Sequence, residues 1–448
     1  MKTKKQGNKK VNVITLGCAK NLVDSEVLVS QLKGNGIEAF HEQKNGDNQI
    51  AIINTCGFIG DAKQESIDTI LQYVEAKKAG MYEKVYVMGC LSQRYRNELG
   101  NEIPGVDAWF GTHELPQLLQ KFKATYRDEL VGERATSTSK HYAYIKISEG
   151  CDRPCSFCAI PLMRGNHVSR PIEELVQEAK NLADKGVREL LVIAQDTTYY
   201  GLDLYKKRNL SELLKRLSDI KGLEWIRLHY AFPAGFPMDI LDVMAERENI
   251  CNYLDIPLQH ASDKMLKIMR RGTDKKRTED LLLSVRTKIP DIAIRTTMLV
   301  GHPGETKKDF EELMEFTNKW KFERLGVFTY SHEEDTHAFT MKDNVATKTK
   351  DDRAAKLMNL QQDVSYELNR QKEGKVFKVL IDRLESGQYI GRTEYDSPEV
   401  DNEVLIDAGK YRLKIGDFAQ IRITGATEFD LHGIPIDKIN AIIRLKTL

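Results

Sequence analysis

Three of the seven cysteines lie close together, at Cys151, Cys155 and Cys158 in the segment EGCDRPCSFCAIP. Thiolates at this C-x3-C-x2-C spacing can hold an iron–sulfur cluster, for which cysteine is the standard protein ligand. Three ligands leave one iron of a four-iron cluster open, and a small molecule can bind there, as at an open catalytic zinc. A structural zinc site is the alternative, but it needs a fourth nearby ligand, and the next histidine is His167.

A second set of three cysteines is dispersed along the N-terminal part of the chain. Cys18 follows VNVITLG, Cys56 follows QIAIINT and Cys90 follows KVYVMG, and each of these runs has the pattern of a short strand. The carboxyl ends of parallel strands line one crevice of an open α/β sheet, so the three thiols can meet there. Separate buried cysteines are the alternative. Cys251 belongs to neither set and is expected to be buried and inert.

The elements that position these cysteines form two successive groups. Over 11–130, β-branched runs alternate with amphipathic segments, which predicts a parallel sheet covered by helices. Over 137–372, six strand–helix units follow one another, too few for an eight-stranded barrel, so an open (β/α)6 partial TIM barrel is expected. The compact cysteine loop follows its first strand, at the end where such barrels hold active sites. The stretch 123–141, rich in Ser, Thr and charge, is typical of a linker.

The C-terminal part of the sequence has a different character. A long charged helical segment begins near Thr347, and Gly374 ends it in the manner of a helix C-cap. From there to about residue 440, short strands are separated by Gly, Asp and Pro, which predicts a small antiparallel β-barrel. An α/β protein of three domains is therefore expected, with limits at 11–130, 137–372 and 374–440.

Composition and charge restrict the class of protein. With 41% hydrophobic and 30% charged residues and a net charge of +1, the chain is typical of soluble globular proteins and has no overall attraction to nucleic acid or membranes. Residues 1–10 are expected to be a disordered tail. No apolar segment follows them, so a signal peptide is not expected. No run approaches the roughly 20 apolar residues of a membrane span. A cytoplasmic protein is expected. In that reducing compartment, clustered cysteines more often bind metal than form disulfides.

The compact cysteine loop resembles that of the radical S-adenosylmethionine (radical SAM) enzymes. The order of the three domains resembles the methylthiotransferases of that superfamily from about Val11 to Asp437, and in these the last domain is an OB-like barrel called TRAM. S-adenosylmethionine would bind the open iron through its amino and carboxylate groups. The resemblance implies two 4Fe–4S clusters, the first on Cys18, Cys56 and Cys90 and the second on Cys151, Cys155 and Cys158.

Two branches of the methylthiotransferases differ in substrate. One modifies an adenosine of transfer RNA, and the other modifies an aspartate of small-subunit ribosomal protein S-twelve. The transfer-RNA branch tends to have Gln-Met-Asn where this chain has Ala19, Lys20 and Asn21, and a tyrosine where it has Glu149. The segments that resemble the ribosomal-protein branch are TLGCAKNLVDSE (15–26), ISEGCDRPCSFCAIPLMRG (147–165), AQDTTYYG (194–201), YLDIPLQHASDKMLKIMRR (253–271) and RTTMLVGHPGETKKDFEEL (295–313).

The resemblance implies methylthiolation of the β-carbon of that aspartate, with S-adenosylmethionine as both methyl donor and source of a 5′-deoxyadenosyl radical. A reductant protein is the second partner implied, and no catalytic residue beyond the cluster ligands is indicated. From Gly374 to Leu448, six Lys and five Arg face seven Asp and five Glu, which suits a basic ribosomal protein better than transfer RNA. A transfer-RNA adenosine methylthiotransferase and an electron carrier are the alternatives.

Two further side chains are candidates for contacts with S-adenosylmethionine. Phe157 matches an aromatic residue of the family and would lie near the adenine, with core packing as the alternative. Gln195, at the end of the second barrel strand, would reach the methionine part, with a surface position as the alternative. The basic run 270–277 either meets an anionic partner or forms a solvated turn.

Overall fold

The computed structural model describes residues 10–43, 48–130 and 132–436. The tail expected at 1–10 lies outside the described residues except for Lys10, and so does the end of the last domain expected at 440. Within the described ranges, no helix is long and apolar enough to cross a membrane.

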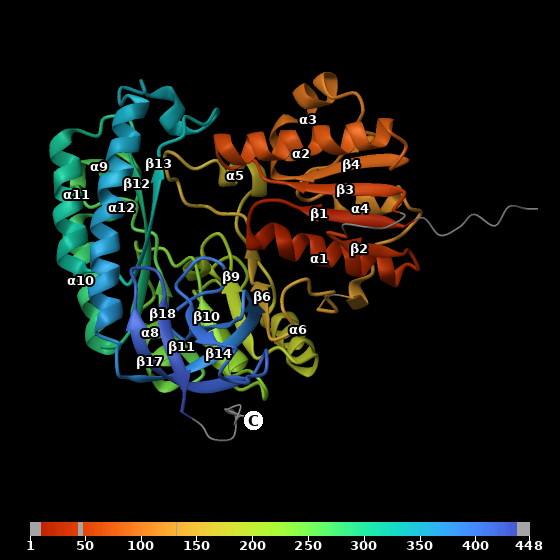
Figure 1. Ribbon diagram of the computed structural model, residues 1–448. Helices are drawn as coiled ribbons and strands as arrows, with labels where there is room; N and C mark the ends of the chain where they lie inside the picture. Colours follow the sequence, from red (N-terminus) through yellow and green to blue (C-terminus); the bar gives the residue numbers. More distant parts are fainter. Residues whose placement is uncertain (1–9, 44–47, 131, 437–448) are drawn as a thin grey trace, which may run out of the picture.

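The first domain is a parallel sheet with helices on both faces (Figure 1, orange and red). Its strands are β1 (Val11–Thr15), β2 (Ala39–His41), β3 (Ile50–Thr55), β4 (Lys84–Gly89) and β5 (Ala108–Trp109), and its helices are α1 (Ala19–Gly34), α2 (Gly60–Lys78), α3 (Cys90–Glu102) and α4 (Leu115–Gln120). The strand order is β2-β1-β3-β4-β5. Apolar side chains of α1 and α4 pack on one face and those of α2 and α3 on the other.

The central domain is an open sheet of six parallel strands in the order β13-β12-β11-β10-β9-β6. The strands are β6 (Tyr142–Lys146), β9 (Glu189–Ile193), β10 (Trp225–Leu228), β11 (Ile250–Asp255), β12 (Ala293–Val300) and β13 (Arg324–Thr329). The covering helices are α6 (Ile172–Asp184), α7 (Leu210–Ser218), α8 (Asp239–Glu246), α10 (Lys275–Lys288), α11 (Lys307–Trp320) and α12 (Thr347–Arg370). Together they enclose the largest apolar core, which confirms the predicted open (β/α)6 barrel.

Short strands, helices and turns lie around the barrel, mostly at the carboxyl ends of its strands. They are β7 (Ser148–Glu149), β8 (Val168–Ser169), α5 (Ile160–Arg164), α9 (Asp263–Ile268) and the 3-10 turns η2 (Thr197–Tyr199) and η3 (His337–Thr340); a further turn, η1 (Asp128–Leu130), precedes β6. The compact cysteine loop lies between β7 and α5, so it stands at the carboxyl end of the first barrel strand, as predicted.

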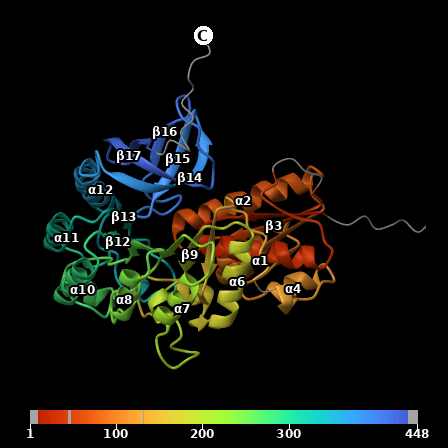
Figure 2. The same cartoon turned by 90° about the horizontal axis from the view of Figure 1, so that it is seen from below.

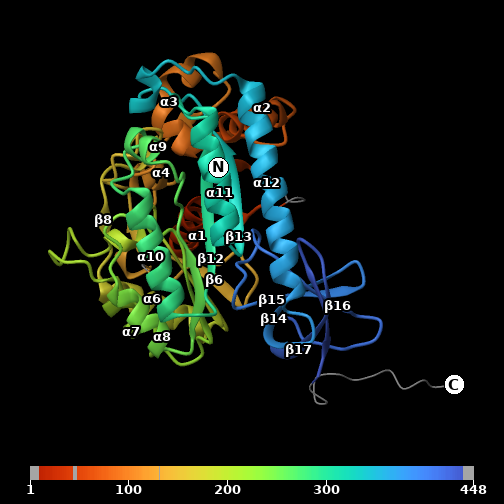
Figure 3. The same ribbon diagram turned by 90° about the vertical axis from the view of Figure 1, so that its left-hand side faces the viewer.

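The C-terminal domain is a closed five-stranded barrel in the order β14-β15-β16-β18-β17 (Figure 2, blue). Its strands are β14 (Val376–Glu385), β15 (Gln388–Thr393), β16 (Val404–Asp407), β17 (Phe418–Ala426) and β18 (Leu431–Pro435). The pairs are antiparallel except β16 with β18, which is parallel, and the predicted small β-barrel is confirmed. Helix α12 runs beside α11 and carries this barrel at its end (Figure 3), where Ser365 and Asn369 donate hydrogen bonds to the β17–β18 turn.

The segment between the first two domains is firmly held rather than a loose linker. Arg134 is 4% exposed, and its guanidinium forms ion pairs with Glu26 of α1 at 3.2 Å and Glu178 of α6 at 3.3 Å. On the opposite side of the first domain, Lys63 and Arg94 both pair with Glu333 after β13, at 2.9 and 3.1 Å. The N-terminal domain is therefore fixed to the barrel on two sides.

A buried seam of charged side chains joins the C-terminal barrel to the central one. Arg392 of β15 pairs with Glu189 at 2.7 Å and with Asp382 at 2.6 Å, and Glu189 also pairs with Arg227 at 2.7 Å. Burial opposes ionisation of Glu189, but Arg392 and Arg227 outweigh it and lower the pKa of this carboxyl. Since a buried charge is costly without its partner, the seam specifies one docking position.

Replacing Arg392 by Met is expected to destabilise the protein by about 3 kcal/mol, because Glu189 and Asp382 would stay buried without the guanidinium they share. The measurement is the shift of the urea-unfolding midpoint. Arg383→Met on neighbouring β14 is the control: that side chain is 45% exposed and pairs with Glu403 on the surface, so its loss should cost less than about 1 kcal/mol. Equal shifts for the two variants would contradict the assignment of the seam.

Candidate functional site

The three dispersed cysteines converge at one edge of the N-terminal sheet. β1, β3 and β4 are neighbours and parallel, and Cys18, Cys56 and Cys90 lie just beyond their carboxyl ends. Burial raises the pKa of the Cys56 thiol to about 11, and the nearby thiols of Cys18 and Cys90 add to the rise. Gly17 allows this approach, because a Cβ there would lie 2.7 Å from Cys56 Cβ, and its φ of +90° suits glycine.

One buried amide connects the three loops of this set. Asn21 Nδ2 donates to the carbonyl of Leu16, before the first cysteine, at 2.8 Å, and to the carbonyl of Thr55, before the second, at 3.1 Å. Its Oδ1 lies 3.8 Å from the thiol of Cys90 and accepts a hydrogen bond from Arg164. Asn21, which in the sequence only distinguishes one branch of the family, thus holds the three loops together.

The compact loop brings its own three cysteines together. The Cys158 amide donates to the Cys155 carbonyl at 3.2 Å, and the Cys151 amide donates to the carbonyl of Gly165 at 3.1 Å. Burial raises the pKa of Cys151 to about 11 and that of Cys158 to about 12, and the neighbouring Cys155 thiol adds to both. Thiols in such surroundings stay protonated until a cation compensates the thiolate charge.

Each set of cysteines has one arginine on a sulfur. Arg164 Nε donates to Cys90 Sγ at 3.3 Å, and Arg271 Nη1 donates to Cys155 Sγ at 3.1 Å. Arg271 lies in the basic run 270–277, but it is 4% exposed, so the solvated interpretation was wrong for this residue. The spacing of the arginines along the chain does not mark them as sulfur partners. They therefore could not be predicted from the sequence.

The chemistry of the two donor sets fits iron–sulfur clusters. All seven cysteines are free thiols, and Cys251 is 1% exposed and distant from both sets in the sheet, as expected. Within the described ranges, no three Cys, His, Asp or Glu side chains close around a point as a single metal ion requires. A four-iron cluster is wider than an ion and takes its ligands around its corners.

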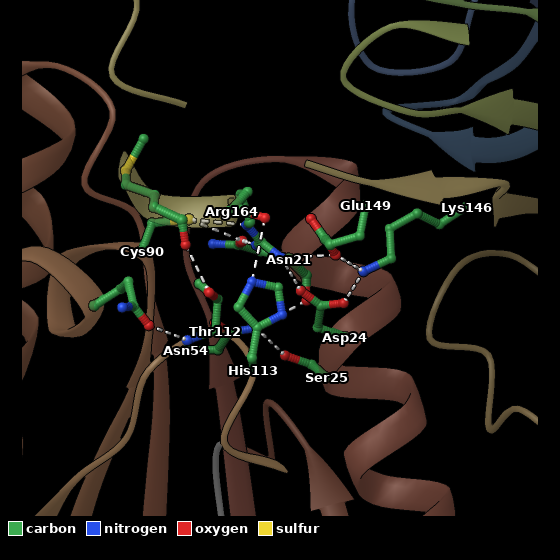
Figure 4. A network of polar contacts seen from close by, with 12 residues as sticks. Asn21, Asp24, Ser25, Asn54, Cys90, Thr112, His113, Lys146, Glu149 and Arg164 are labelled. Carbon is green, nitrogen blue, oxygen red and sulfur yellow. Dashed lines mark hydrogen bonds and ion pairs between the residues drawn. The ribbon is translucent and has the colours of Figure 1, made fainter. Parts of the chain in front are cut away.

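The two cysteine sets lie side by side. Cys90, at the start of α3, packs against Ala159 and Met163 of the segment that follows Cys158. Figure 4 shows how polar contacts reinforce this junction: Arg164 pairs with Asp24 of α1 at 2.6 Å and with Glu149 at 3.3 Å. The first domain therefore presents its cysteines directly to the compact cysteine loop.

Gln195 and Glu149 complete this junction on the barrel side. Gln195 Nε2 donates to Glu149 Oε1 at 3.0 Å, and Gln195 is half-buried, which contradicts the surface alternative. Burial opposes ionisation of Glu149, but Lys146 and Arg164 outweigh it and lower its pKa to about 2. Gln195 Oε1 is buried and accepts no hydrogen bond within the described structure. The amide thus keeps one acceptor available beside the cysteine loop.

Phe157 lies against the apolar core rather than in the open. Its half-buried ring packs with Met265, Met269 and Leu299, and it meets the His302 ring edge-on at 6.3 Å between centroids. These contacts fit the alternative in which Phe157 packs in the core.

Comparison with protein families divides the chain in the same way. Residues 10–111 match the uncharacterized protein family UPF0004, residues 145–317 match the Radical SAM superfamily, and residues 374–436 match the TRAM domain. The radical SAM match begins in β6 and contains the compact cysteine loop.

Curated relatives cover nearly the whole chain. "Ribosomal protein uS12 methylthiotransferase RimO" of Cytophaga hutchinsonii is 61% identical over 97% of this chain and 99% of that protein. The protein of the same name from Bacteroides thetaiotaomicron is 53% identical over 96% of this chain and 99% of that protein. This chain belongs to the RimO family. It is therefore a radical SAM methylthiotransferase, and membership implies a 4Fe–4S cluster and S-adenosylmethionine.

Solved structures support the fold of this RimO-family chain. The radical S-adenosylmethionine methyltransferase TsrM from Kitasatospora setae, solved with cobalamin and a [4Fe-4S] cluster, has a TM-score of 0.54. It is 14% identical and covers 86% of this chain and 80% of its own. At that identity the likeness concerns the arrangement of elements alone.

Proposed function

We propose that this chain methylthiolates the β-carbon of an aspartate in ribosomal protein uS12, with S-adenosylmethionine as methyl donor and as radical source. The carrying observation is the contact between the two cysteine sets through Cys90, Ala159 and Met163. A transferred sulfur group and a carbon radical must meet before either reacts elsewhere, and proximity is the protein's main contribution to such a step.

We further propose two 4Fe–4S clusters in the expected sets. Cys18, Cys56 and Cys90 would hold the first, and Cys151, Cys155 and Cys158 the second. When bound, the second cluster supplies the electron that cleaves S-adenosylmethionine. The proposal is supported by the convergence of free thiols in each set and by the arginine on one sulfur of each.

The chain's own side chains then have distinct tasks. Arg164 and Arg271 place positive charge beside Cys90 and Cys155, which stabilises the thiolates that a metal needs. The acceptor Gln195 Oε1 is suited to an ammonium such as the amino group of S-adenosylmethionine. Phe157 would border the adenine with the part of its ring that the core leaves exposed.

The charge of the C-terminal barrel favours a protein substrate over transfer RNA. Its most buried arginine, Arg392, forms ion pairs with Glu189 and Asp382, so its charge is not available to bind phosphates. The remaining Lys and Arg of 374–448 are offset by acidic residues. We propose a cytoplasmic enzyme with domains at 11–130, 137–372 and 374–440, which uses a reductant protein and no transfer RNA.

A direct competition tests the substrate. The reconstituted enzyme, with S-adenosylmethionine and a reductant, is given unmodified uS12 and unmodified transfer RNA together. The expected product is uS12 heavier by one SCH2 unit, with the gain located on an aspartate by fragment mass spectrometry. Methylthiolated adenosine with unchanged uS12 would refute the proposal and support the transfer-RNA alternative.

A further inference from the structure

Lys20 is a buried lysine that has no carboxylate partner among the described residues. It lies two residues after Cys18 in the first turn of α1 and is 8% exposed. Its Nζ lies 3.0 Å from the centroid of the Tyr230 ring, in a cation–π contact. Over the described ranges, no carboxylate forms an ion pair with it, although buried lysines are normally paired.

The neighbouring charges do not supply the missing partner. Asp255, which accepts from the Tyr230 amide, already pairs with Arg295. Asp24 and Glu149 of the junction each already pair with both Lys146 and Arg164. Two carboxylates thus face two cations, and that group is balanced. Lys20 is a further positive charge beside this balanced group.

Tyr230 is held in place for this contact. Its φ of +56° is unusual for a non-glycine residue. Its carbonyl accepts hydrogen bonds from the amide and hydroxyl of Thr197, at 3.1 and 3.2 Å, and its amide donates to Asp255 at 3.1 Å. A backbone conformation of this kind persists only where its surroundings fix it, and it is common at ligand sites.

The pair lies where α1 meets the central barrel, since Tyr230 packs in one apolar cluster with Ala19 and Leu22 of α1. Tyr230 follows β10, at the carboxyl end of the barrel strands, and Thr197 is two residues from Gln195, whose amide binds Glu149 beside the compact loop. Lys20 comes from the opposite side, on the helix that Cys18 begins. A group bound by Lys20 would therefore lie beside the helix that Cys18 begins, where it meets the carboxyl end of β10.

We propose that Lys20, supported by the Tyr230 ring, binds the side-chain carboxylate of the target aspartate. The inference rests on the proposed function, because the aspartate is the anion that this function brings to the junction. The carboxylate is bonded to the β-carbon. An ion pair between Lys20 and the carboxylate therefore orients the C–H bond that must react. In this proposal the substrate supplies the carboxylate partner of Lys20. A substrate with asparagine at that position has no such charge and binds less tightly.

The test compares two labelled peptides of the uS12 loop, one with the target aspartate and one with asparagine there, for binding to the reconstituted enzyme. The native enzyme should bind the aspartate peptide about 10- to 100-fold more tightly. Lys20→Met should weaken the aspartate peptide by that factor, leave the asparagine peptide unchanged and so erase the discrimination. Lys20→Arg, which keeps the charge, should retain part of it. Lys33→Met, an exposed lysine on the same helix, should retain all of it.

Four outcomes would overturn the inference: equal binding of both peptides by the native enzyme, full discrimination by Lys20→Met, equal weakening of both peptides, or loss of S-adenosylmethionine affinity with discrimination intact. Equal weakening would mean a packing role, and the last outcome would assign the carboxylate to S-adenosylmethionine. Should Lys20→Met not fold, Lys20→Gln gives the same comparison.

The aspartate peptide is also assayed for methylthiolation by the native enzyme. If the native enzyme modifies it and Lys20→Met still discriminates, the inference fails alone. If the native enzyme leaves the aspartate unmodified, the proposed function fails and the inference with it.

Discussion

Alanine at Cys18, Cys56 and Cys90 together is expected to abolish methylthio transfer while the enzyme still cleaves S-adenosylmethionine to 5′-deoxyadenosine. The three thiols come from the N-terminal sheet, whereas the compact loop lies on the barrel and keeps its own three cysteines. A loss of more than about a thousandfold in product is expected, because the sulfur group would have no site from which to be delivered. Chromatographic quantification of 5′-deoxyadenosine and mass spectrometry of uS12 give the two readouts.

Retained product formation by this triple variant would contradict the division of labour. The N-terminal domain would then be an ordinary packed α/β unit, and the sulfur would come from elsewhere. Cys251→Ala is the matched control, because Cys251 is a buried thiol of β11 and belongs to neither set. That variant should keep both activities.

Anaerobically reconstituted protein should contain about eight irons, and alanine at Cys151, Cys155 and Cys158 together should leave about four. The reason is that each set supplies three thiolates, the number that holds one cubane with an open corner. Iron and sulfide are measured chemically, and zinc is measured in the same samples. The variant should also lose all cleavage of S-adenosylmethionine.

Zinc in place of iron, or a triple variant that retains all its iron, would contradict the proposed clusters. The triple alanine variant of the N-terminal set supplies the reciprocal measurement, since it should also retain about four irons. The two variants together then assign one cluster to each set, which the total alone cannot do.

The positions of the cysteines could be predicted because they depend on local patterns. Each N-terminal cysteine follows a β-branched run, and parallel neighbours bring the ends of β1, β3 and β4 to one edge. The compact loop needed only its spacing and the strand before it. The six barrel strands were recognisable for the same reason, since each apolar run is followed by a helical segment.

The partners of the cysteines could not be predicted, because they depend on contacts between distant residues. Asn21 meets Arg164 across the junction of two domains, and Arg271 reaches Cys155 across more than a hundred residues. The seam at Arg392 has the same character, since its carboxylates lie on β9 and β14. The composition of 123–141 predicts a linker, but not that Arg134 within it is buried between α1 and α6.

The attachment of the N-terminal domain on two sides has a consequence for how the substrate must be shaped. Arg134 is held between α1 and α6, and Glu333 is held by Lys63 and Arg94, so a movement of the domain away from the barrel would break buried ion pairs on two sides. Lys20 and Tyr230 are already in contact across this junction, with Nζ 3.0 Å from the ring centroid. A substrate of the proposed function must therefore bring its aspartate to a junction that is already assembled, so the shape of the substrate, and not closure of the domain, decides the fit.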